Sequence, residues 1–179
     1  FLTVRNHSIA LIEKRYSFYT DQFFSQSENI IRVEAMNKIS NKGEIVELSQ
    51  DTLEFKRVIL GDSKNHYSYP FTFIDQNKEF ILPEVASHSK QFLIRKPYEE
   101  NNKIFLRGLE QPLIDPNLIK FRGVYYLFAG FSSSGTTEQN LFYSVDSFIG
   151  PYKPHQLNPI VVNPKGARNA GRIYKKNGE

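Results

Sequence analysis

Acidic side chains recur at the ends of predicted strands, in a pattern that suits ligand binding or acid–base chemistry. Asp21 and Asp115 lie near the starts of two aromatic strands, whereas Glu34 and Glu84 end two apolar ones. A carboxyl group accepts hydrogen bonds when ionised and donates one when protonated, so converging carboxyls can bind hydroxyl groups or move a proton. The candidate catalytic residues are Asp21, Asp115 and Glu84; the candidate ligand-binding residues are Glu34, His66, Tyr69 and Arg168.

The element that must position Asp115 is a hairpin over Leu113–Gly130. Its sequence predicts a strand that opens at Asp115-Pro116, a tight turn at Arg122-Gly123 and a second, aromatic strand. Tyr69-Pro70 repeats the Asp115-Pro116 pair 46 residues upstream, and Asn77 then aligns with Gly123 without a gap. Self-similarity at such an interval predicts a repeated structural unit.

The composition favours β-strands over helices and excludes some kinds of functional site. The chain has 15 Phe and 10 Tyr, no Trp and no Cys. Aromatic side chains fit a pleated, half-buried surface, and the lack of Cys excludes disulfides and thiolate metal sites. The formal charge is only +4, and basic residues cluster only within Lys165–Lys176, so we expect no nucleic-acid partner. No apolar run approaches the ~20 residues of a membrane helix, and no spacing assigns a cofactor or a metal ligand.

The predicted fold class is all-β, a partial propeller of about three four-stranded blades and the start of a fourth. The blade boundaries are 16–62, 63–110 and 111–164, with 1–15 ending a preceding segment and 165–179 starting the next blade. The predicted strands are Ser8–Lys14, Phe18–Phe24, Ile30–Ala35, Glu44–Ser49, Glu54–Leu60, His66–Ile74, Glu79–Glu84, Gln91–Arg95, Lys103–Gly108, the Leu113–Gly130 hairpin, Gln139–Ser144 and Arg168–Tyr174, the last with a turn at Asn177-Gly178. The alternative is a β-sandwich with coincidental hairpins.

Propeller geometry predicts that the polar residues converge. In each blade, the start of the first strand and the end of the second strand lie at the same mouth of the central channel. This geometry is expected to place seven residues at one rim: Asp21, Glu34, His66, Tyr69, Glu84, Asp115 and Arg168. Such convergence is the usual setting of a ligand site. Other interpretations stay open: Asp115 caps a turn, Glu34 and Glu84 are ordinary strand ends, His66 is a turn residue, and Arg168 pairs with carboxylates for structure.

Five strings in order carry a family resemblance: YTDQFF, HYSYPFTF with ILPE, LIDPNLIKFRGVYYLFAG, GPYKPHQLNPIVV and ARNAGRIY. They resemble the propeller domain that precedes the glycosyltransferase domain of plant glucosamine inositolphosphorylceramide transferases. In bacteria, similar propellers accompany formyltransferase-like or glycosyltransferase domains. More remotely, the strings are similar to the five-bladed propellers of family 43 and family 32 glycoside hydrolases. The resemblance implies a partial five-bladed propeller.

The hydrolase resemblance also implies roles. By blade position Asp21 corresponds to the base and Asp115 to the aspartate that orients and tunes. The fourth unit opens with Arg168-Asn169-Ala170-Gly171, without the glutamate expected as acid, and Glu84 lies on a second strand. Glycosidase chemistry needs two carboxyls roughly 5–9.5 Å apart.

Three functions follow. The first is a carbohydrate-associated propeller that binds or presents a sugar or glycoconjugate for a glycosyltransferase or formyltransferase-like domain. The second is a glycoside hydrolase-like enzyme that uses the rim carboxylates, and the third is a non-catalytic scaffold for protein partners. Because the chain starts at Phe1 and stops at a turn signal, we interpret it as a fragment that self-associates without its remaining blades.

Overall fold

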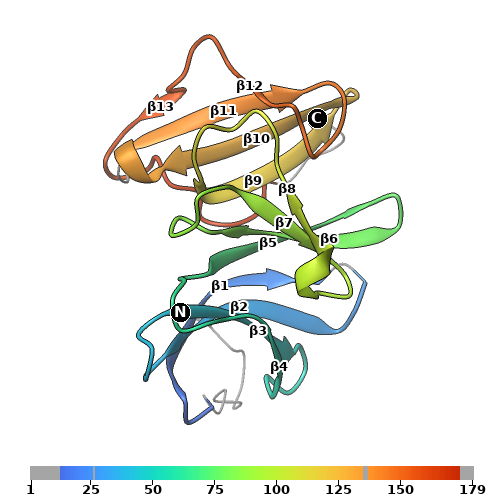
Figure 1. Cartoon of the computed structure of the whole chain (residues 1–179), viewed down its shortest axis with the longest axis vertical. Helices are drawn as coiled ribbons and strands as arrows, with labels where there is room; N and C mark the ends of the chain where they lie inside the picture. The colour runs from blue at the N-terminus through green and yellow to red at the C-terminus, as the bar shows by residue number, and fades with distance from the viewer. Residues whose placement is uncertain (1–12, 26, 135–136, 174–179) are drawn as a thin grey trace. The chain divides into compact units, whose positions relative to one another are not determined.

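The computed structural model describes residues 13–25, 27–134 and 137–173. These residues form β-strands joined by short turns, together with two short 3₁₀ turns at Glu100–Asn102 and Ser132–Ser134 (Figure 1). The strands are β1 Tyr16–Phe24, β2 Ile30–Asn37, β3 Gly43–Ser49, β4 Phe55–Leu60, β5 Ser68–Asp75, β6 Lys78–Glu84, β7 Phe92–Arg95, β8 Lys103–Phe105, β9 Leu113–Phe121, β10 Val124–Phe131, β11 Glu138–Ser144, β12 Lys153–Pro154 and β13 Val161–Val162. The all-β prediction is confirmed.

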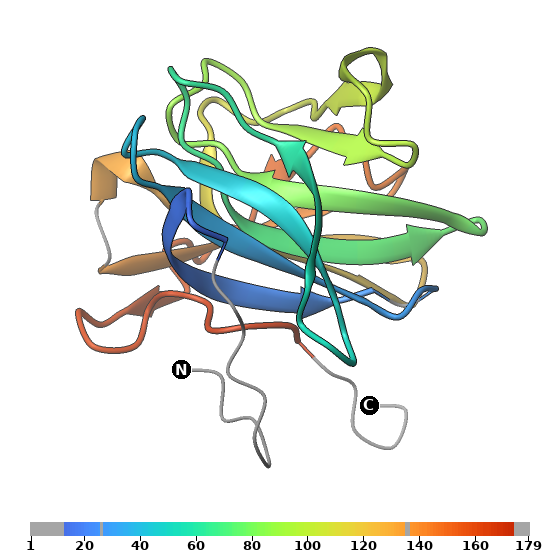
Figure 2. The same cartoon turned by 90° about the horizontal axis from the view of Figure 1, so that it is seen from below.

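The strands form three sheets, each a meander. Their orders are β1-β2-β3-β4, β5-β6-β7-β8 and β9-β10-β11-β12, with β13 also pairing with β11. Consecutive strands are therefore neighbours, as a propeller blade requires. Figure 2 shows the first of these meanders from below. The meander prediction is confirmed for all three sheets.

Two predictions differ from the structure at the C-terminal end. The Pro-rich passage after Gly150 holds the two-residue strands β12 and β13, which the sequence did not indicate. Proline lacks an N–H and breaks up a ladder, which explains why these strands are short. Arg168–Ile173 form no strand, although a strand was predicted there. The predicted Ser8–Lys14 strand lies mostly, and the turn at Asn177-Gly178 entirely, outside the described residues.

The repeat is visible in the backbone of two hairpins. Gln76 and Asn77 link β5 to β6 with φ of 47° and 60°, and Arg122 and Gly123 link β9 to β10 with φ of 48° and 82°. Two central residues with positive φ make a type I′ turn, whose twist matches that of the strands. The alignment of Asn77 with Gly123 therefore describes equivalent turn positions.

The chain divides into two compact units. Unit 1 contains residues 13–83 and 94–103 of the described chain, and unit 2 contains residues 84–93 and those from 104 onward. The core of unit 1 includes Tyr16, Val33, Val46 and Leu48 on the first sheet. In unit 2, buried side chains on β9, β10 and β11 include Leu113, Leu127, Ala129 and Phe142. Among the described residues, no helix has the length and apolar content that crossing a bilayer requires.

Unit 1 also buries a charged cluster, which we call the Arg32 cluster: Arg32, Glu47, Glu79, Arg57 and Tyr98. Arg32 Nη2 lies 3.1 Å from Glu47 Oε1 and 2.9 Å from Glu79 Oε2, and the Arg32 side chain is 0% exposed. Arg57 Nε donates to Glu47 at 2.7 Å, and the Tyr98 hydroxyl donates to Glu79 at 2.9 Å. Buried charges are tolerated when each is paired and hydrogen-bonded, as here.

Candidate functional site

The backbone at Asp115 adopts an unusual conformation near the start of β9. Its φ is 46°, in the left-handed region, and the β9–β10 ladder shifts register close by, between Phe128 and Gly130. Tyr69 and Asp21 have φ of 47° and 49°, and the β1–β2 ladder also shifts around Asp21. Non-glycine residues seldom adopt this conformation. Its recurrence on the first strand of all three sheets supports the repeat. At Asp21 and Asp115 it coincides with a register shift, as at a β-bulge that re-aims a side chain.

Arg168 binds Asp115 through two parallel hydrogen bonds. Arg168 Nε lies 2.5 Å from Asp115 Oδ2, and Arg168 Nη2 lies 2.9 Å from Asp115 Oδ1. The Asp115 side chain is 5% exposed, but that of Arg168 is 49% exposed. This bidentate geometry fixes the guanidinium while half of the arginine side chain remains in contact with solvent.

Glu84, at the end of β6, completes the group that we call the Asp115 site: Glu84, Asp115 and Arg168. Glu84 Oε2 accepts a hydrogen bond from the Asp115 backbone N–H at 3.1 Å and lies 3.7 Å from Arg168 Nη2. Burial raises the pKa of Glu84 to about 7; the Asp115 N–H and Arg168 oppose the rise, whereas the charge of Asp115 and a hydrogen bond with its carboxyl add to it. Near neutral pH the Glu84 carboxyl thus keeps its proton in part of the molecules.

Asn169 positions the backbone of this site. Its Nδ2 donates to Asp115 O at 2.7 Å and to Phe128 O at 3.2 Å, and its Oδ1 accepts from Gln139 Nε2. The one side chain therefore ties together β9, β10 and β11. Sequence analysis did not single out Asn169 or Gln139. The adjacency of Asn169 to Arg168, which is a predicted site residue, was the only signal in the sequence.

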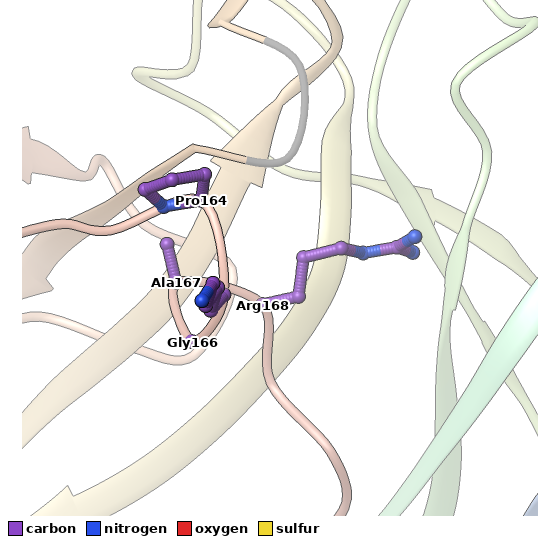
Figure 3. A pocket seen from close by; sticks show the side chains of 5 residues that line it. Pro164, Gly166, Ala167 and Arg168 are labelled. Atoms are coloured by element: carbon purple, nitrogen blue, oxygen red, sulfur yellow. The ribbon is translucent and has the colours of Figure 1, made fainter.

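Arg168 also belongs to the turn that lines a pocket of about 260 Å³, together with Pro164, Lys165, Gly166 and Ala167. In Figure 3 the Arg168 side chain leads away from Pro164 and Ala167. Asn163 holds the turn, because its Oδ1 accepts the Lys165 N–H at 2.9 Å and its backbone oxygen accepts the Ala167 N–H at 3.1 Å. These hydrogen bonds fix the backbone of the turn that lines the pocket.

Glu34 and His66 form a separate pair in unit 1. His66 Nε2 lies 3.2 Å from Glu34 Oε1, and the Gly43 N–H donates to His66 Nδ1 at 2.9 Å. Because Nδ1 accepts a hydrogen bond, the proton of the neutral ring lies on Nε2, facing Glu34. Glycine is required at residue 43, since a Cβ there would lie 2.6 Å from Tyr67 O and 2.7 Å from Glu34 Oε1. The pair is tightly packed.

The structure thus groups the predicted site residues in two sets. Glu84, Asp115 and Arg168 meet in unit 2; Glu34 and His66 meet in unit 1. Asp21 is half-buried on β1. Tyr69 is buried, and its ring packs edge-on against that of Phe23 with 4.9 Å between the ring centres, which favours a packing role. Convergence of all seven residues on one rim stays a prediction. Within the described residues, no three His, Asp or Glu side chains come together as metal ligands would.

Solved structures similar to this chain are glycoside hydrolases of family 43. A thermostable family-43 glycoside hydrolase matches with a TM-score of 0.56 and 17% identity, covering 82% of this chain and 54% of its own. The Bacteroides ovatus xyloglucan PUL protein GH43B also has a TM-score of 0.56, at 16% identity, covering 83% and 31%. An exo-β-1,3-galactanase of Phanerochaete chrysosporium has a TM-score of 0.53 at 14% identity, covering 75% and 34%. These likenesses describe the fold, a partial five-bladed propeller.

Curated relatives in plants share more of the sequence. The Oryza sativa subsp. japonica protein named glucosamine inositolphosphorylceramide transferase 1 is 36% identical over 132 residues, covering 69% of this chain and 17% of its own length. The Arabidopsis thaliana protein of that name is 30% identical over 124 residues, covering 65% and 16%. The chain thus spans about a sixth of these relatives. The family described as glucosamine inositolphosphorylceramide transferase 1, N-terminal, matches residues 5–179. The chain belongs to this N-terminal domain family.

Proposed function

We propose that this propeller binds a carbohydrate or glycoconjugate and presents it to a glycosyltransferase or formyltransferase-like domain of the same protein. The observation that carries the proposal is the half-exposed side chain of Arg168, whose guanidinium is held by Asp115 beside a carboxyl group that is partly protonated near neutral pH. Support also comes from the plant relatives, whose name, glucosamine inositolphosphorylceramide transferase 1, contains a sugar and a lipid.

The Asp115 site offers the hydrogen-bonding groups that sugar hydroxyls need. A hydroxyl group donates one hydrogen bond and accepts others, so it pairs best with a site that contains both donors and acceptors. Arg168 supplies N–H donors, and the carboxyl group of Glu84 supplies an acceptor and, when protonated, a donor. Hydrogen bonds to ionised groups are shorter and stronger than those between neutral groups. The site therefore suits a polyhydroxylated ligand.

The contact between Glu84 and Asp115 excludes these two carboxyls as the acid and the base of a glycoside hydrolase. Glu84 is hydrogen-bonded to both the backbone N–H and the carboxyl of Asp115. Two carboxyls that act on opposite sides of a glycosidic bond stand roughly 5–9.5 Å apart, which leaves space for the sugar or a water molecule. Groups in direct contact leave no such space. Arg168 also donates a hydrogen bond to each carboxylate oxygen of Asp115.

A glycoside hydrolase-like activity is the second candidate, because one observation favours it. The pKa of Glu84 is raised to about 7, the range in which a carboxyl acts efficiently as a general acid near neutral pH. In this scheme Glu84 donates a proton to the leaving group, and Asp21 and Asp115 supply the base and the orienting carboxylate. The two candidates predict different effects of the same substitutions.

The test uses the complete protein, with glycan binding measured by calorimetry and array and with turnover measured on a glycoside panel. Arg168→Ala and Asp115→Asn should each weaken glycan binding at least tenfold. The first removes the guanidinium, and the second removes the negative charge and one of the two acceptors that orient it. Arg122→Ala is the matched control, since Arg122 is exposed at the opposite end of the β9–β10 hairpin. Turnover that Glu84→Gln and Asp115→Asn abolish would support the hydrolase instead. Absence of both binding and turnover would leave neither proposal standing.

A further inference from the structure

The segment between β12 and β13 forms an arch on the outer edge of the third sheet. β12 pairs with Phe142 and Tyr143 of β11, and β13 pairs with Glu138 and Gln139 on the same edge. Residues 155–160, which we call the arch, connect the two short strands and rise away from β11 (Figure 1). The nearest paired positions on β11 are three residues apart, so the arch spans roughly 10 Å.

Hydrogen bonds hold the arch in a fixed shape. The Asn158 side chain accepts the Leu141 N–H at 2.8 Å and donates to Leu141 O at 2.8 Å, so it takes the place of a strand in the ladder. His155 N donates to the same Leu141 O at 2.9 Å, and Asn158 N donates to His155 O at 3.1 Å. The Leu157 N–H donates to His155 Nδ1 at 3.2 Å. An arch that is ordered in advance lowers the entropic cost of binding a partner.

The arch exposes apolar side chains instead of burying them. Leu157, near its middle, is 74% exposed, and Val162, on β13, is 67% exposed. Pro159 between them is exposed as well. A protein partner usually needs an interface of about 800 Å² on each side, which a short protruding arch does not offer by itself. Apolar side chains on a protrusion can instead enter the boundary between lipid head groups and acyl chains.

The charge around the arch is positive. Residues 147–178 contain six Lys or Arg and no Asp or Glu. Of these, Lys153, just before the arch, and Lys165, just after β13, are exposed. The ladder places one acidic residue beside them, Glu138, which is half-buried opposite Val162. Exposed lysines next to exposed apolar side chains complement an anionic lipid surface, where each lysine raises the affinity about fivefold.

We propose that the arch docks the propeller on an anionic phospholipid surface, with Leu157 in the head-group layer and Lys153 and Lys165 facing the lipid phosphates and carboxylates. This contact goes beyond glycan binding and does not depend on it, because it uses the outer edge of the third sheet and none of the residues of the Asp115 site. The apolar and the charged contacts act together, since stable peripheral binding takes two signals.

The test measures flotation of the complete protein with vesicles of phosphatidylcholine alone or with phosphatidylserine added. Binding should be stronger to the anionic vesicles and should weaken as salt is raised. Leu157→Ser should lower binding to the anionic vesicles about tenfold, because it removes the apolar anchor. Ile39→Ser is the matched control, because Ile39 is 92% exposed but lies at a turn of unit 1.

Lys153→Gln combined with Lys165→Gln should lower binding to the anionic vesicles roughly twentyfold and leave binding to neutral vesicles unchanged. Glu138→Gln should strengthen binding to the anionic vesicles. Lys78→Gln is the matched control, since Lys78 is exposed at the start of β6 in unit 1.

Amide hydrogen exchange locates the contact where another part of the complete protein also binds lipid. Exchange of the Gln156 amide, next to Leu157, should slow on anionic vesicles and should be restored to its free rate by Leu157→Ser. Vesicle binding that both the Leu157 and the double lysine variants retain, with unchanged exchange at the arch, would overturn the proposal and leave the arch to a protein partner. Equal binding of the wild-type protein to neutral and anionic vesicles would overturn it as well.

Discussion

Each compact unit contains one charged cluster, and the two differ in how their charges are balanced. In the Arg32 cluster of unit 1, two arginines face two glutamates, and Arg32 is fully buried. In the Asp115 site of unit 2, one arginine faces two carboxyls, and its side chain is half-exposed. The first cluster has as many cations as carboxylates, and its contact with solvent is mainly through Arg57. The second has one carboxyl more than it has cations.

The two glutamates Glu79 and Glu84 show the consequence of this difference. Burial raises the pKa of Glu79, but hydrogen bonds from Arg32 and the charge of Arg32 outweigh it and lower the pKa to about 2. Burial also raises the pKa of Glu84, and there the single arginine does not offset it, so the pKa reaches about 7. Two glutamates thus have opposite pKa shifts because one faces a buried arginine with complete pairing and the other shares one arginine with a second carboxyl.

The largest expected effect is on stability, at Arg32. Arg32→Ala leaves the carboxylates of Glu47 and Glu79 buried without their main partner, which should lower the free energy of unfolding by about 3–5 kcal/mol. Arg57→Ala is the matched control, because Arg57 contacts the same Glu47 but its side chain is 51% exposed. It should cost about 0–1 kcal/mol. Urea unfolding measures both, and similar losses for the two variants would contradict a special role for burial.

Arg168→Ala should lower stability less than Arg32→Ala does, and it should weaken glycan binding. Solvent reaches half of the Arg168 side chain, so water can partly replace it beside Asp115, and we expect a loss of about 1–2 kcal/mol in urea unfolding. Glycan binding should fall at least tenfold in the same variant. A loss of unfolding free energy as large as that of Arg32→Ala, with glycan binding unchanged, would show that the Asp115 site is structural. The two clusters would then not differ in role.

The pH dependence of stability should separate Glu84 from Glu79. The pKa of Glu84 is higher in the folded chain than its ordinary value of 4.5, so its contribution to stability is complete below pH 4.5 and is lost as pH rises to about 7. Glu79 has the opposite sign: its contribution is present above pH 4.5 and is lost as pH falls toward about 2.

Glu84→Gln should therefore flatten the fall in unfolding free energy between pH 4.5 and 7 and leave the acid limb below pH 4.5 unchanged. Urea titrations at half-unit pH steps measure the two slopes. A variant that keeps the wild-type slope between pH 5 and 7 would show that Glu84 is not the group with the raised pKa.

Sequence reasoning predicted the elements better than the contacts. Aromatic runs and turn residues identified the meanders, and the alignment of Tyr69 with Asp115 matched positions that share a positive φ. The pairing of Asp115 with Arg168 and Asn169 depends on a chain path of more than fifty residues, which local patterns do not determine. The Arg32 cluster was also missed, although one of its ion pairs could have been predicted. Arg32 lies directly opposite Glu47 in the β2–β3 ladder, so the hairpin register alone would have indicated that pair.

Substitutions in the two charged clusters should have different effects on stability, whereas glycine substitutions at the equivalent turns of the two hairpins should have similar effects. Gln76 and Arg122 are both exposed at the first central turn position, with φ of 47° and 48°. Glycine adopts this conformation without a Cβ penalty, so Gln76→Gly should raise the unfolding free energy by a few tenths to about 1 kcal/mol. Arg122→Gly should gain slightly less, because Arg122 also lies 5.1 Å above the ring of Phe121. Urea unfolding of both variants is the measurement, and a loss above about 1 kcal/mol at either turn would show that the two hairpins do not share the type I′ backbone.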